Sequence, residues 1–582
     1  MKKEPLHRLI SLTVLTLTIS LAGSATFAQN KAAKIDALVG QYVANRQFNG
    51  TVLVAEKGQV IFKKGYGMAN MEWDIANAPD TKFRLGSITK QFTAMLIMQL
   101  VEKGKLTLTG KITDYLPDYP KATGDKITIH HLLTHTSGIP NYTGFPKFFE
   151  TQSRDPYTPE TFTKEFADRP LDFEPGSKFS YSNSGYFLLG VIIEKVTSKS
   201  YADVLKENIL APLKLTDTGY DLFSPILPKR ATGYEKKSTG YANAPYLDMS
   251  IPYAAGSLYS TVEDLYRWDQ ALYTDKLLSA TGKTTMYTPY LDGYAYGWGV
   301  SNVKVGQLND SLLVIGHGGG INGFNTLISR LPKDRQLVVL LNNTGGAPLN
   351  DIQRNILRIL YNQPVEAPKK SIAEMLRRSV LSEPLTQSRQ KFTVWKVDKA
   401  YSVNERDVNA LGYELMRDGK LTEAIAVFTL NAEAFPASYN VYDSRGEAHM
   451  NAGDKPAAVA DYKKSVALNP RNDTGFAKLK ELGEPVEMPK ELVAAVDTAV
   501  LDSYVGNYQL APTFSIVITR EGNKLYAQAT GQSRFELFTE SKTKFYFKVV
   551  DAQVTFAPNE KGEVEQLVLH QNGRDMPAKR LR

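Results

Sequence analysis

Short runs of alternating apolar and polar residues stand near both ends of the first 365 positions, with longer helix-like runs between them. Residues 51–68 hold two β-branched runs that meet at Lys57-Gly58, which is the pattern of a β-hairpin. Further strand-like runs follow through short turns at 296–300, 312–315, 324–330 and 336–341. Consecutive strands joined by short turns form antiparallel sheets. We therefore expect an α+β domain, with helices packed on an antiparallel sheet.

Helix-like spacing appears in three stretches of this region. One mostly apolar run begins near Ser87 and ends before Gly104, and a second covers Phe187–Val196. The third lies within 127–140 and predicts a helix whose end is closed by Ser137-Gly138. These helices would cover the sheet and bury their apolar faces against it.

A 34-residue period appears in residues 401–485: Gly412, Ala424, Phe428 and Pro436 recur as Gly446, Ala458, Tyr462 and Pro470. The period and the residue types resemble two tetratricopeptide repeats, each of which is a helix pair that must stack on a neighbour. Residues 366–400 are expected to form a helical linker or a degenerate repeat. Such repeats either bind a protein or peptide ligand or act as a rigid spacer, and both interpretations stay open.

Evenly spaced strand candidates fill the end of the chain: 514–519, 525–530, 534–538, 544–550, 552–557 and 564–570. Short strands separated by glycine- and asparagine-containing turns predict an antiparallel barrel or a small sandwich in residues 495–582. This region resembles a lipocalin-like β-barrel domain.

The N-terminus has the pattern of a secretory signal peptide. Lys2, Lys3 and Arg8 precede the apolar run Leu9–Leu21, and small residues lead to a cleavage site near Ala28. A membrane anchor is the alternative, but the run is short for a bilayer span. We predict a periplasmic or secreted bacterial protein with no membrane attachment after cleavage. The absence of cysteine suits export and excludes disulfides and thiol catalysis.

Composition narrows the class of partner. The 582 residues are 42% hydrophobic and 22% charged, which is ordinary for globular protein. The net charge of +8 is modest for this length and shows no concentrated basic stripe, so we expect no nucleic-acid partner.

Four Ser-x-x-Lys strings occur, so this pattern discriminates weakly by itself. Ser301–Lys304 and Ser541–Lys544 lie in strand-like alternation, where positions three apart point to opposite faces, and Ser388–Lys391 lies in a polar helical stretch. Only Ser87 and Lys90 open a long apolar helix, where residues three apart share a face. Desolvation would make Lys90 a neutral base, and the helix start would favour negative charge. We therefore predict that Ser87 is a nucleophile, although a capping serine beside a solvated lysine is the structural alternative.

Two further motifs complete the candidate site. Tyr181 and Asn183 lie in a predicted extended loop, where residues two apart point the same way, and could relay a proton and orient a carbonyl. His317 begins a His-Gly-Gly-Gly string at the start of a predicted strand, where glycines let a ligand approach the backbone. An α/β-hydrolase oxyanion loop would need a Gly-x-Ser-x-Gly elbow, which the chain lacks. Three histidines lie at 130, 131 and 135, but no other histidine or acidic residue lies within a helical turn of them and the chain has no cysteine. We therefore predict neither metal nor cofactor.

The motifs Ser87-x-x-Lys90, Tyr181-x-Asn183 and His317-Gly318-Gly319 resemble, in that order, the serine β-lactamase and penicillin-recognising hydrolase superfamily. The closest resemblance is to its class C-like branch of D-aminopeptidases, carboxylesterases and DD-peptidases. It covers residues 35–362 and implies an acyl-enzyme on Ser87, with Lys90 and Tyr181 sharing proton transfer. It also implies substrate binding by Asn183, His317, Gly319 and Gly320, and an oxyanion hole from the N–H groups of Ser87 and Gly320.

One departure from the superfamily bears on substrate choice. Where β-lactamases carry Lys-Thr-Gly, this chain has His317-Gly318-Gly319, so a fixed cation becomes an imidazole that is mostly neutral near pH 7. We therefore predict a hydrolase of small esters or D-amino-acid amides and peptides. The alternatives are a non-catalytic receptor for β-lactams or peptidoglycan fragments, and a true class C-like β-lactamase.

The predicted chain is thus multidomain. Its parts are a signal peptide at 1–28, a β-lactamase-like hydrolase domain at 29–365, a helical linker at 366–400, all-α repeats at 401–485 and an antiparallel β-barrel at 495–582.

Overall fold

A computed structural model describes most of the chain. The described residues are 30–145, 148–238, 240–470, 472–485, 497–511, 514–530, 534–547, 552–559, 563–571 and 574–581. The predicted signal peptide lies outside them. Contacts divide the chain into two compact units, Met1–Lys370 and Ser371–Arg582. Within the described ranges, no helix combines the length and the apolar character that crossing a membrane requires.

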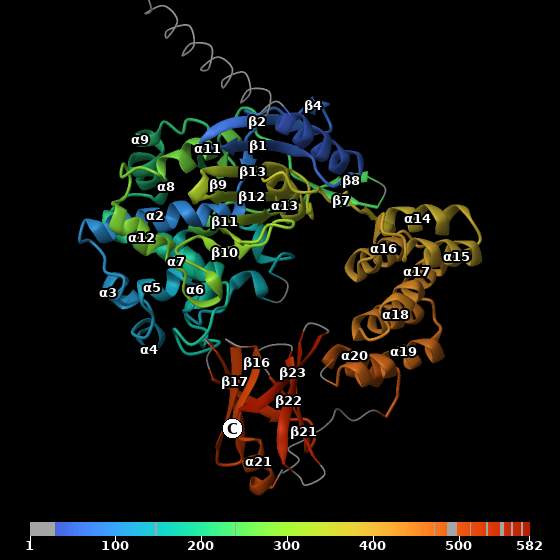
Figure 1. Cartoon of the computed structure of the whole chain (residues 1–582). Coiled ribbons are helices and arrows are strands. Elements are labelled where there is room, and N and C mark those ends of the chain that lie inside the picture. Colours follow the sequence, from blue (N-terminus) through green and yellow to red (C-terminus); the bar gives the residue numbers. More distant parts are fainter. Residues whose placement is uncertain are drawn as a thin grey trace, which may run out of the picture. The chain divides into compact units, whose positions relative to one another are not determined.

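The first unit is built on a six-stranded sheet in the order β10-β11-β12-β13-β1-β2, in which every pair is antiparallel (Figure 1). Its strands are β1 Gly50–Glu56, β2 Gln59–Tyr66, β10 Gly299–Val303, β11 Leu312–Ile321, β12 Phe324–Leu331 and β13 Gln336–Asn342. The predicted hairpin is present, and both turn residues, Lys57 and Gly58, have positive φ. Because β1 pairs with β13, the two ends of the domain meet in the middle of the sheet.

Helices cover both faces of this sheet, and the alternation of side chains along its strands explains why. One face buries residues against the helix over 30–44 and against α13 (Leu349–Leu360): Val52, Val54, Val338 and Leu340. The other face packs on α2 (Thr89–Glu102), α7 (Asn183–Thr197) and α11 (Val262–Ala271) through Leu53, Ala55, Val339 and Leu341. The prediction of helices on an antiparallel sheet is confirmed.

The remaining elements of this unit are short. They are β3 Met68–Asn70, β4 Ile75–Ala76, β5 Phe83–Arg84, α3 Ile112–Tyr115, α4 Lys121–Gly124, α5 Ile129–Leu133, α6 Pro159–Ala167, α8 Tyr201–Leu205, α9 Ala211–Leu213, β6 Gly219–Tyr220, β7 Tyr234–Lys237, β8 Gly240–Asn243, α10 Tyr253–Gly256, β9 Leu258–Ser260 and α12 Ala280–Tyr287. A small sheet of order β5-β9-β6 leads the chain into the turn that carries Ser87.

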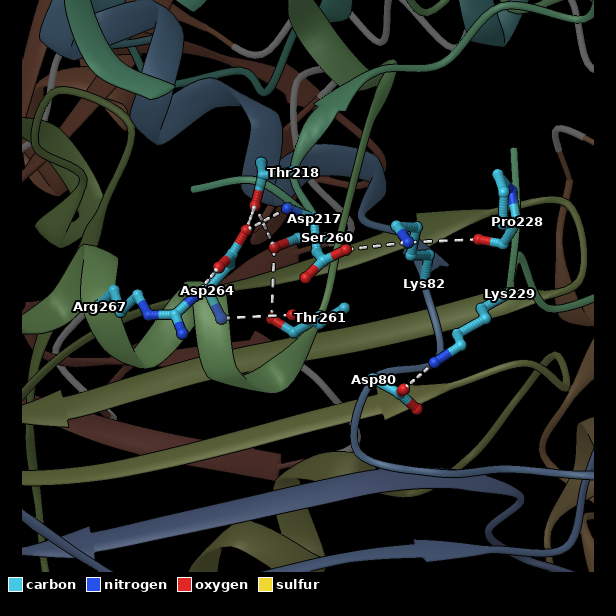
Figure 2. Close-up of polar contacts among 10 residues, drawn as sticks. All are labelled: Asp80, Lys82, Asp217, Thr218, Pro228, Lys229, Ser260, Thr261, Asp264 and Arg267. Carbon is cyan, nitrogen blue, oxygen red and sulfur yellow. Dashed lines mark hydrogen bonds and ion pairs between the residues drawn. The ribbon is translucent and has the colours of Figure 1, made fainter. Parts of the chain in front are cut away.

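A buried carboxylate ties this small sheet to α11 (Figure 2). The side chain of Asp264 accepts hydrogen bonds from the Asp217 N–H at 2.8 Å and from the Thr218 hydroxyl at 2.9 Å. Its other oxygen accepts from Arg267 at 2.6 Å. Asp217 also forms a salt bridge at 3.0 Å with Lys82, which lies one residue before β5 in the sequence. The network therefore fixes the strand that enters the Ser87 turn.

Three local predictions are corrected by the structure. The helix expected to end at Ser137-Gly138 ends at Leu133, because His135 adopts a left-handed φ of 57° and turns the chain. Asn183 begins α7 rather than lying in an extended loop. The glycine string after His317 lies in the second half of β11, and not at the start of a strand.

The helical part of the second unit repeats with the predicted period. Its helix pairs are α16 Glu405–Arg417 with α17 Leu421–Ala434, and α18 Tyr439–Asn451 with α19 Lys455–Leu468. Each bound of the second pair lies 34 residues after its counterpart. Gly412 faces the ring of Phe428, and Gly446 faces the ring of Tyr462 in the same way. The repeat of helix pairs is therefore structural, while its assignment as tetratricopeptide stays a prediction.

Further helices continue this array of pairs. The predicted linker forms α14 (Ile372–Ser382) and α15 (Leu385–Trp395), and α20 spans Asp473–Glu481. Ile372, Leu376 and Phe392 are buried in one core with α16 and α17, so this segment packs as part of the helical array.

The C-terminal segment forms a closed antiparallel barrel, which decides between the barrel and the sandwich. Its strands are β16 Gly506–Ala511, β17 Phe514–Glu521, β18 Lys524–Ala529, β19 Arg534–Thr539, β20 Lys544–Phe547, β21 Ala552–Pro558, β22 Val564–Gln571 and β23 Arg574–Leu581. The pairing of β16 with β23, two strands that the sequence pattern missed, closes it. Tyr504 of α21 (Thr498–Tyr504) stacks on Phe556 with ring centres 4.2 Å apart.

Candidate active site

Ser87 lies in a tight turn that is pressed against β11. The turn is a 3₁₀ segment directly before α2. Gly86 has a φ of 56°, and a Cβ at this position would lie 2.9 Å from the backbone nitrogen of Gly320, so only glycine fits. The Thr326 hydroxyl donates to the Leu85 carbonyl at 2.7 Å and holds the turn to the sheet. This packing brings the backbone of Ser87 beside Gly320, as an oxyanion hole would require.

The Lys90 side chain is fully buried behind Ser87. Its Nζ lies 3.1 Å from Ser87 Oγ, and donates to Asn183 Oδ1 at 2.8 Å and to the Ala255 carbonyl at 2.9 Å. Burial lowers the pKa of Lys90 well below its ordinary value of 10.5. A neutral amine has two N–H groups and one lone pair. Because the amide and carbonyl oxygens can only accept, they take both N–H groups and leave the lone pair for the serine hydroxyl.

Asn141 sets the orientation of the Asn183 amide. Asn141 Oδ1 accepts from the backbone N–H of Asn183 at 3.0 Å and from its Nδ2 at 3.3 Å, while Asn141 Nδ2 donates to the Thr143 hydroxyl at 2.8 Å. A backbone N–H can only donate, so it fixes which end of each amide faces which partner. The sequence interpretation missed Asn141 and Thr143, because no local pattern placed them beside the start of α7.

Tyr181 covers the other side of the lysine. The Lys90 Nζ lies 4.8 Å from the centre of the Tyr181 ring. The phenol oxygen is buried and has no hydrogen-bond partner of normal geometry among the described residues. Burial raises the Tyr181 pKa, and the nearby Ser87 hydroxyl lowers it by less, so the group stays a neutral phenol. Buried donors without partners are rare in folded proteins, and the Ser87 hydroxyl is the polar group that lies near this one.

His317 is neutral and already has partners on both sides of its ring. Its Nδ1 lies 2.5 Å from the Gly318 carbonyl and therefore carries the proton, so Nε2 accepts from the Tyr294 hydroxyl at 2.8 Å. Burial lowers the pKa of His317 to about 4. The ring centre lies 6.2 Å from that of Tyr181. This environment matches the neutral imidazole that we expected.

A cavity of about 370 Å³ opens in front of Ser87. Of the predicted binding residues, Asn183 and Gly320 line it, whereas His317 and Gly319 do not. Much of its lining is apolar and includes Tyr142, Phe148, Phe149, Leu247, Ile251 and Phe324. None of the described residues that line the cavity carries a charge. The site therefore combines the predicted nucleophile, which lines the cavity, with an uncharged and largely apolar lining.

The sequence profile of the beta-lactamase family matches residues 35–363, more than half of the chain. The chain belongs to the beta-lactamase family. Residues 491–580 match a domain of unknown function (DUF3471). The family assignment confirms the superfamily resemblance and makes this protein a serine hydrolase of the β-lactamase fold.

Sequence and structural similarities to individual proteins agree with this family assignment. Penicillin-binding protein 4* of Bacillus subtilis (strain 168) is 26% identical over 586 residues, which cover 95% of this chain and 99% of that protein. The putative penicillin-binding protein PbpX of the same organism is 31% identical over 327 residues, covering 56% of this chain and 78% of that protein. A crystal structure of D-amino acid amidase from Ochrobactrum anthropi SV3 is 25% identical with a TM-score of 0.50, covering 58% and 98% of the two chains.

Proposed function

We propose that this protein hydrolyses small, uncharged esters or D-amino-acid amides and peptides through an acyl-enzyme on Ser87. The observation that carries the proposal is the buried Lys90 amine, 3.1 Å from the Ser87 hydroxyl, with both of its N–H groups directed to oxygen acceptors. Burial lowers the pKa of Lys90, which favours the neutral amine, the form that can accept the serine proton.

The reaction would proceed in two half-reactions. Lys90 takes the proton as Ser87 Oγ attacks the substrate carbonyl, and the N–H groups of Ser87 and Gly320 stabilise the oxyanion. Tyr181 then donates its proton to the leaving oxygen or nitrogen as that bond breaks, and recovers a proton from the lysine ammonium. Lys90 then takes a proton from water as the water oxygen attacks the acyl carbonyl. The bond from the acyl carbon to Ser87 Oγ breaks, the proton returns to Ser87 Oγ, and the carboxylic acid is released. The unpartnered phenol of Tyr181 supports the role of proton donor.

Charge supports uncharged substrates over penicillins. A penicillin brings a carboxylate, and the described cavity lining holds no cation to pair with it. His317, which stands where β-lactamases carry a lysine, has a pKa of about 4 and is therefore neutral at pH 7. Placing an unpaired carboxylate beside apolar rings is unfavourable. Small esters, and amides or peptides without a free carboxylate at this position, fit the chamber better.

Three finer assignments belong to the same proposal. The signal-peptide pattern supports export to the periplasm or the medium, with cleavage near Ala28. The 34-residue helix pairs support tetratricopeptide-type repeats, which either bind a protein or peptide ligand or act as a rigid spacer. The closed eight-stranded barrel supports a lipocalin-like domain.

A fluorophosphonate probe tests the acyl-enzyme directly. We expect the wild-type protein to be labelled and Ser87→Ala not to be labelled. Ser301→Ala is the matched control, because Ser301 belongs to another Ser-x-x-Lys string and is exposed on β10. Equal labelling of Ser87→Ala, or absent labelling and turnover in the wild type, would refute the proposal and favour a non-catalytic receptor. Rates with p-nitrophenyl esters, D-alanyl amides and peptides, and nitrocefin then rank the substrate classes; fastest turnover of nitrocefin would favour a β-lactamase.

A further inference from the structure

His135 contacts the backbone on both sides of Tyr181. Its carbonyl accepts from the Ser180 N–H at 2.8 Å, and its ring Nδ1 accepts from the Ser182 N–H at 3.1 Å. Its ring also lies on the Tyr181 ring, with centres 4.1 Å apart and planes 35° apart. His135 therefore restrains the residue before Tyr181 through its backbone, and the residue after it and the phenol ring through its side chain.

Histidine at position 135 has two unfavourable features. His135 has a φ of 57°, a left-handed conformation that costs a non-glycine residue roughly 1–2 kcal/mol. Its Nδ1 accepts a hydrogen bond, so Nε2 carries the proton, yet Nε2 is buried without a partner among the described residues. A buried unsatisfied donor costs about 1–3 kcal/mol. Both features are explained if the acceptor at Nδ1 and the flat ring are needed where they are.

Tyr181 has few restraints of its own. It lies in an irregular segment just before α7, and its hydroxyl, which lies near that of Ser87, makes no hydrogen bond of normal geometry among the described residues. Tyr294 also packs edge-on against Tyr181, at 6.1 Å between ring centres, and sits 4.6 Å from the ring of His135. The His135 ring is thus the nearest aromatic surface that defines the plane of the phenol.

We propose that His135 is a positioning residue that holds the Tyr181 hydroxyl in line with the leaving group of the substrate. This inference rests on the proposed function, in which Tyr181 protonates that leaving group. His135 touches neither substrate nor Ser87 in this scheme. It acts through the two backbone N–H groups and through the ring contact.

Two substitutions separate the acceptor from the ring. His135→Asn keeps an acceptor, because the amide Oδ1 occupies the place of Nδ1, and asparagine tolerates a left-handed φ. His135→Phe keeps a ring but has no acceptor for the Ser182 N–H. We expect His135→Asn, which loses the ring contact, to lower kcat by about 3- to 10-fold. We expect His135→Phe, which loses the acceptor, to lose about 100-fold in kcat with KM little changed, as for a misplacement near 1 Å.

The leaving group provides a readout that a purely structural defect would not move. A p-nitrophenolate leaves without protonation, whereas the alkoxide of an ethyl ester needs a proton from Tyr181. The rate ratio of the p-nitrophenyl ester to the ethyl ester of one acid should therefore rise at least tenfold in His135→Phe. Tyr181→Phe should raise the ratio similarly, and His135→Phe should add little in that background.

His131→Phe is the matched control. His131 lies four residues earlier, and its Nδ1 likewise accepts a backbone N–H, from Thr128 at 3.2 Å. We expect its ester ratio to equal that of the wild type. An unchanged ratio in His135→Phe would overturn the positioning role while labelling of Ser87 still upheld the proposed function. If His135→Phe does not fold, His135→Gln is the second test. The side-chain oxygen of glutamine lies one bond further out than Nδ1, so it is misplaced for the Ser182 N–H. A wild-type ester ratio in His135→Gln would refute the positioning role.

Discussion

Gly319→Ala should damage the site without touching any group that reacts. A Cβ on Gly319 would lie 1.9 Å from the Leu85 carbonyl oxygen and 2.3 Å from the Thr326 hydroxyl. Ordinary contact begins near 3.4 Å, so the methyl group is roughly 1.5 Å too close. Neither oxygen can retreat easily, because Thr326 and Leu85 are buried and hydrogen-bonded to each other at 2.7 Å.

The size of the effect follows from this geometry. Overpacking of a well-packed site costs about 1–3 kcal/mol in the free energy of unfolding. The turn that carries Ser87 must also move away from β11, which separates its N–H from that of Gly320. Loss of one oxyanion donor or a misplacement near 1 Å lowers turnover by about 100-fold. We therefore expect Gly319→Ala to fold with a lowered unfolding midpoint and to lose roughly two orders of magnitude in kcat/KM.

The assay is p-nitrophenyl ester hydrolysis together with urea unfolding. Gly318→Ala is the neighbouring control, because a Cβ there meets nothing closer than the Thr326 carbonyl oxygen at 3.7 Å. Its free energy of unfolding should stay within about 0.5 kcal/mol of the wild-type value, as for substitutions without a special contact. If Gly319→Ala matches Gly318→Ala in both assays, the close packing of the Ser87 turn on β11 is refuted.

Three further predictions follow from the same structure. Burial lowers the pKa of Lys90, so between that pKa and 10.5 the unfolded chain binds one more proton than the folded chain, and the stability of the wild type rises with pH. In urea unfolding at several pH values, the free energy of unfolding of Lys90→Met relative to wild type should therefore fall across this window. A difference that stays constant with pH would contradict the prediction. Asn141→Ala removes the one oxygen that accepts from both the backbone N–H and the Nδ2 of Asn183, and the loss of about 1 kcal/mol of orientation should lower kcat about 5- to 10-fold. Steady-state rates equal to wild type would exclude that role. Gly412→Ala places a Cβ 2.5 Å from a ring atom and Gly446→Ala one at 3.3 Å, so hydrogen exchange of α16–α19 should accelerate more in the first variant, and the reverse order would be inconsistent with the packing.

Much of the fold could be read from local pattern. The hairpin at Lys57-Gly58, the antiparallel runs of the sheet and the 34-residue period all depend on neighbours in sequence, so periodicity and turn chemistry predict them. The contact between Ser87 and Lys90 is local as well, since the two residues are three positions apart in the sequence. Boundaries were less predictable. The sequence pattern gave no sign that His135 would end its helix early, or that β16 and β23 would close the barrel.

The partners that complete the site are distant in sequence, and only the packed structure selects them. Lys90 bonds the Ala255 carbonyl across 165 positions, Asn183 depends on Asn141 across 42, and the Ser182 N–H finds His135 across 47. Residue types and short spacing can nominate a serine, a lysine and a tyrosine. Whether the lysine is neutral depends on how completely its neighbours exclude water, and that exclusion exists only after the chain has folded around it.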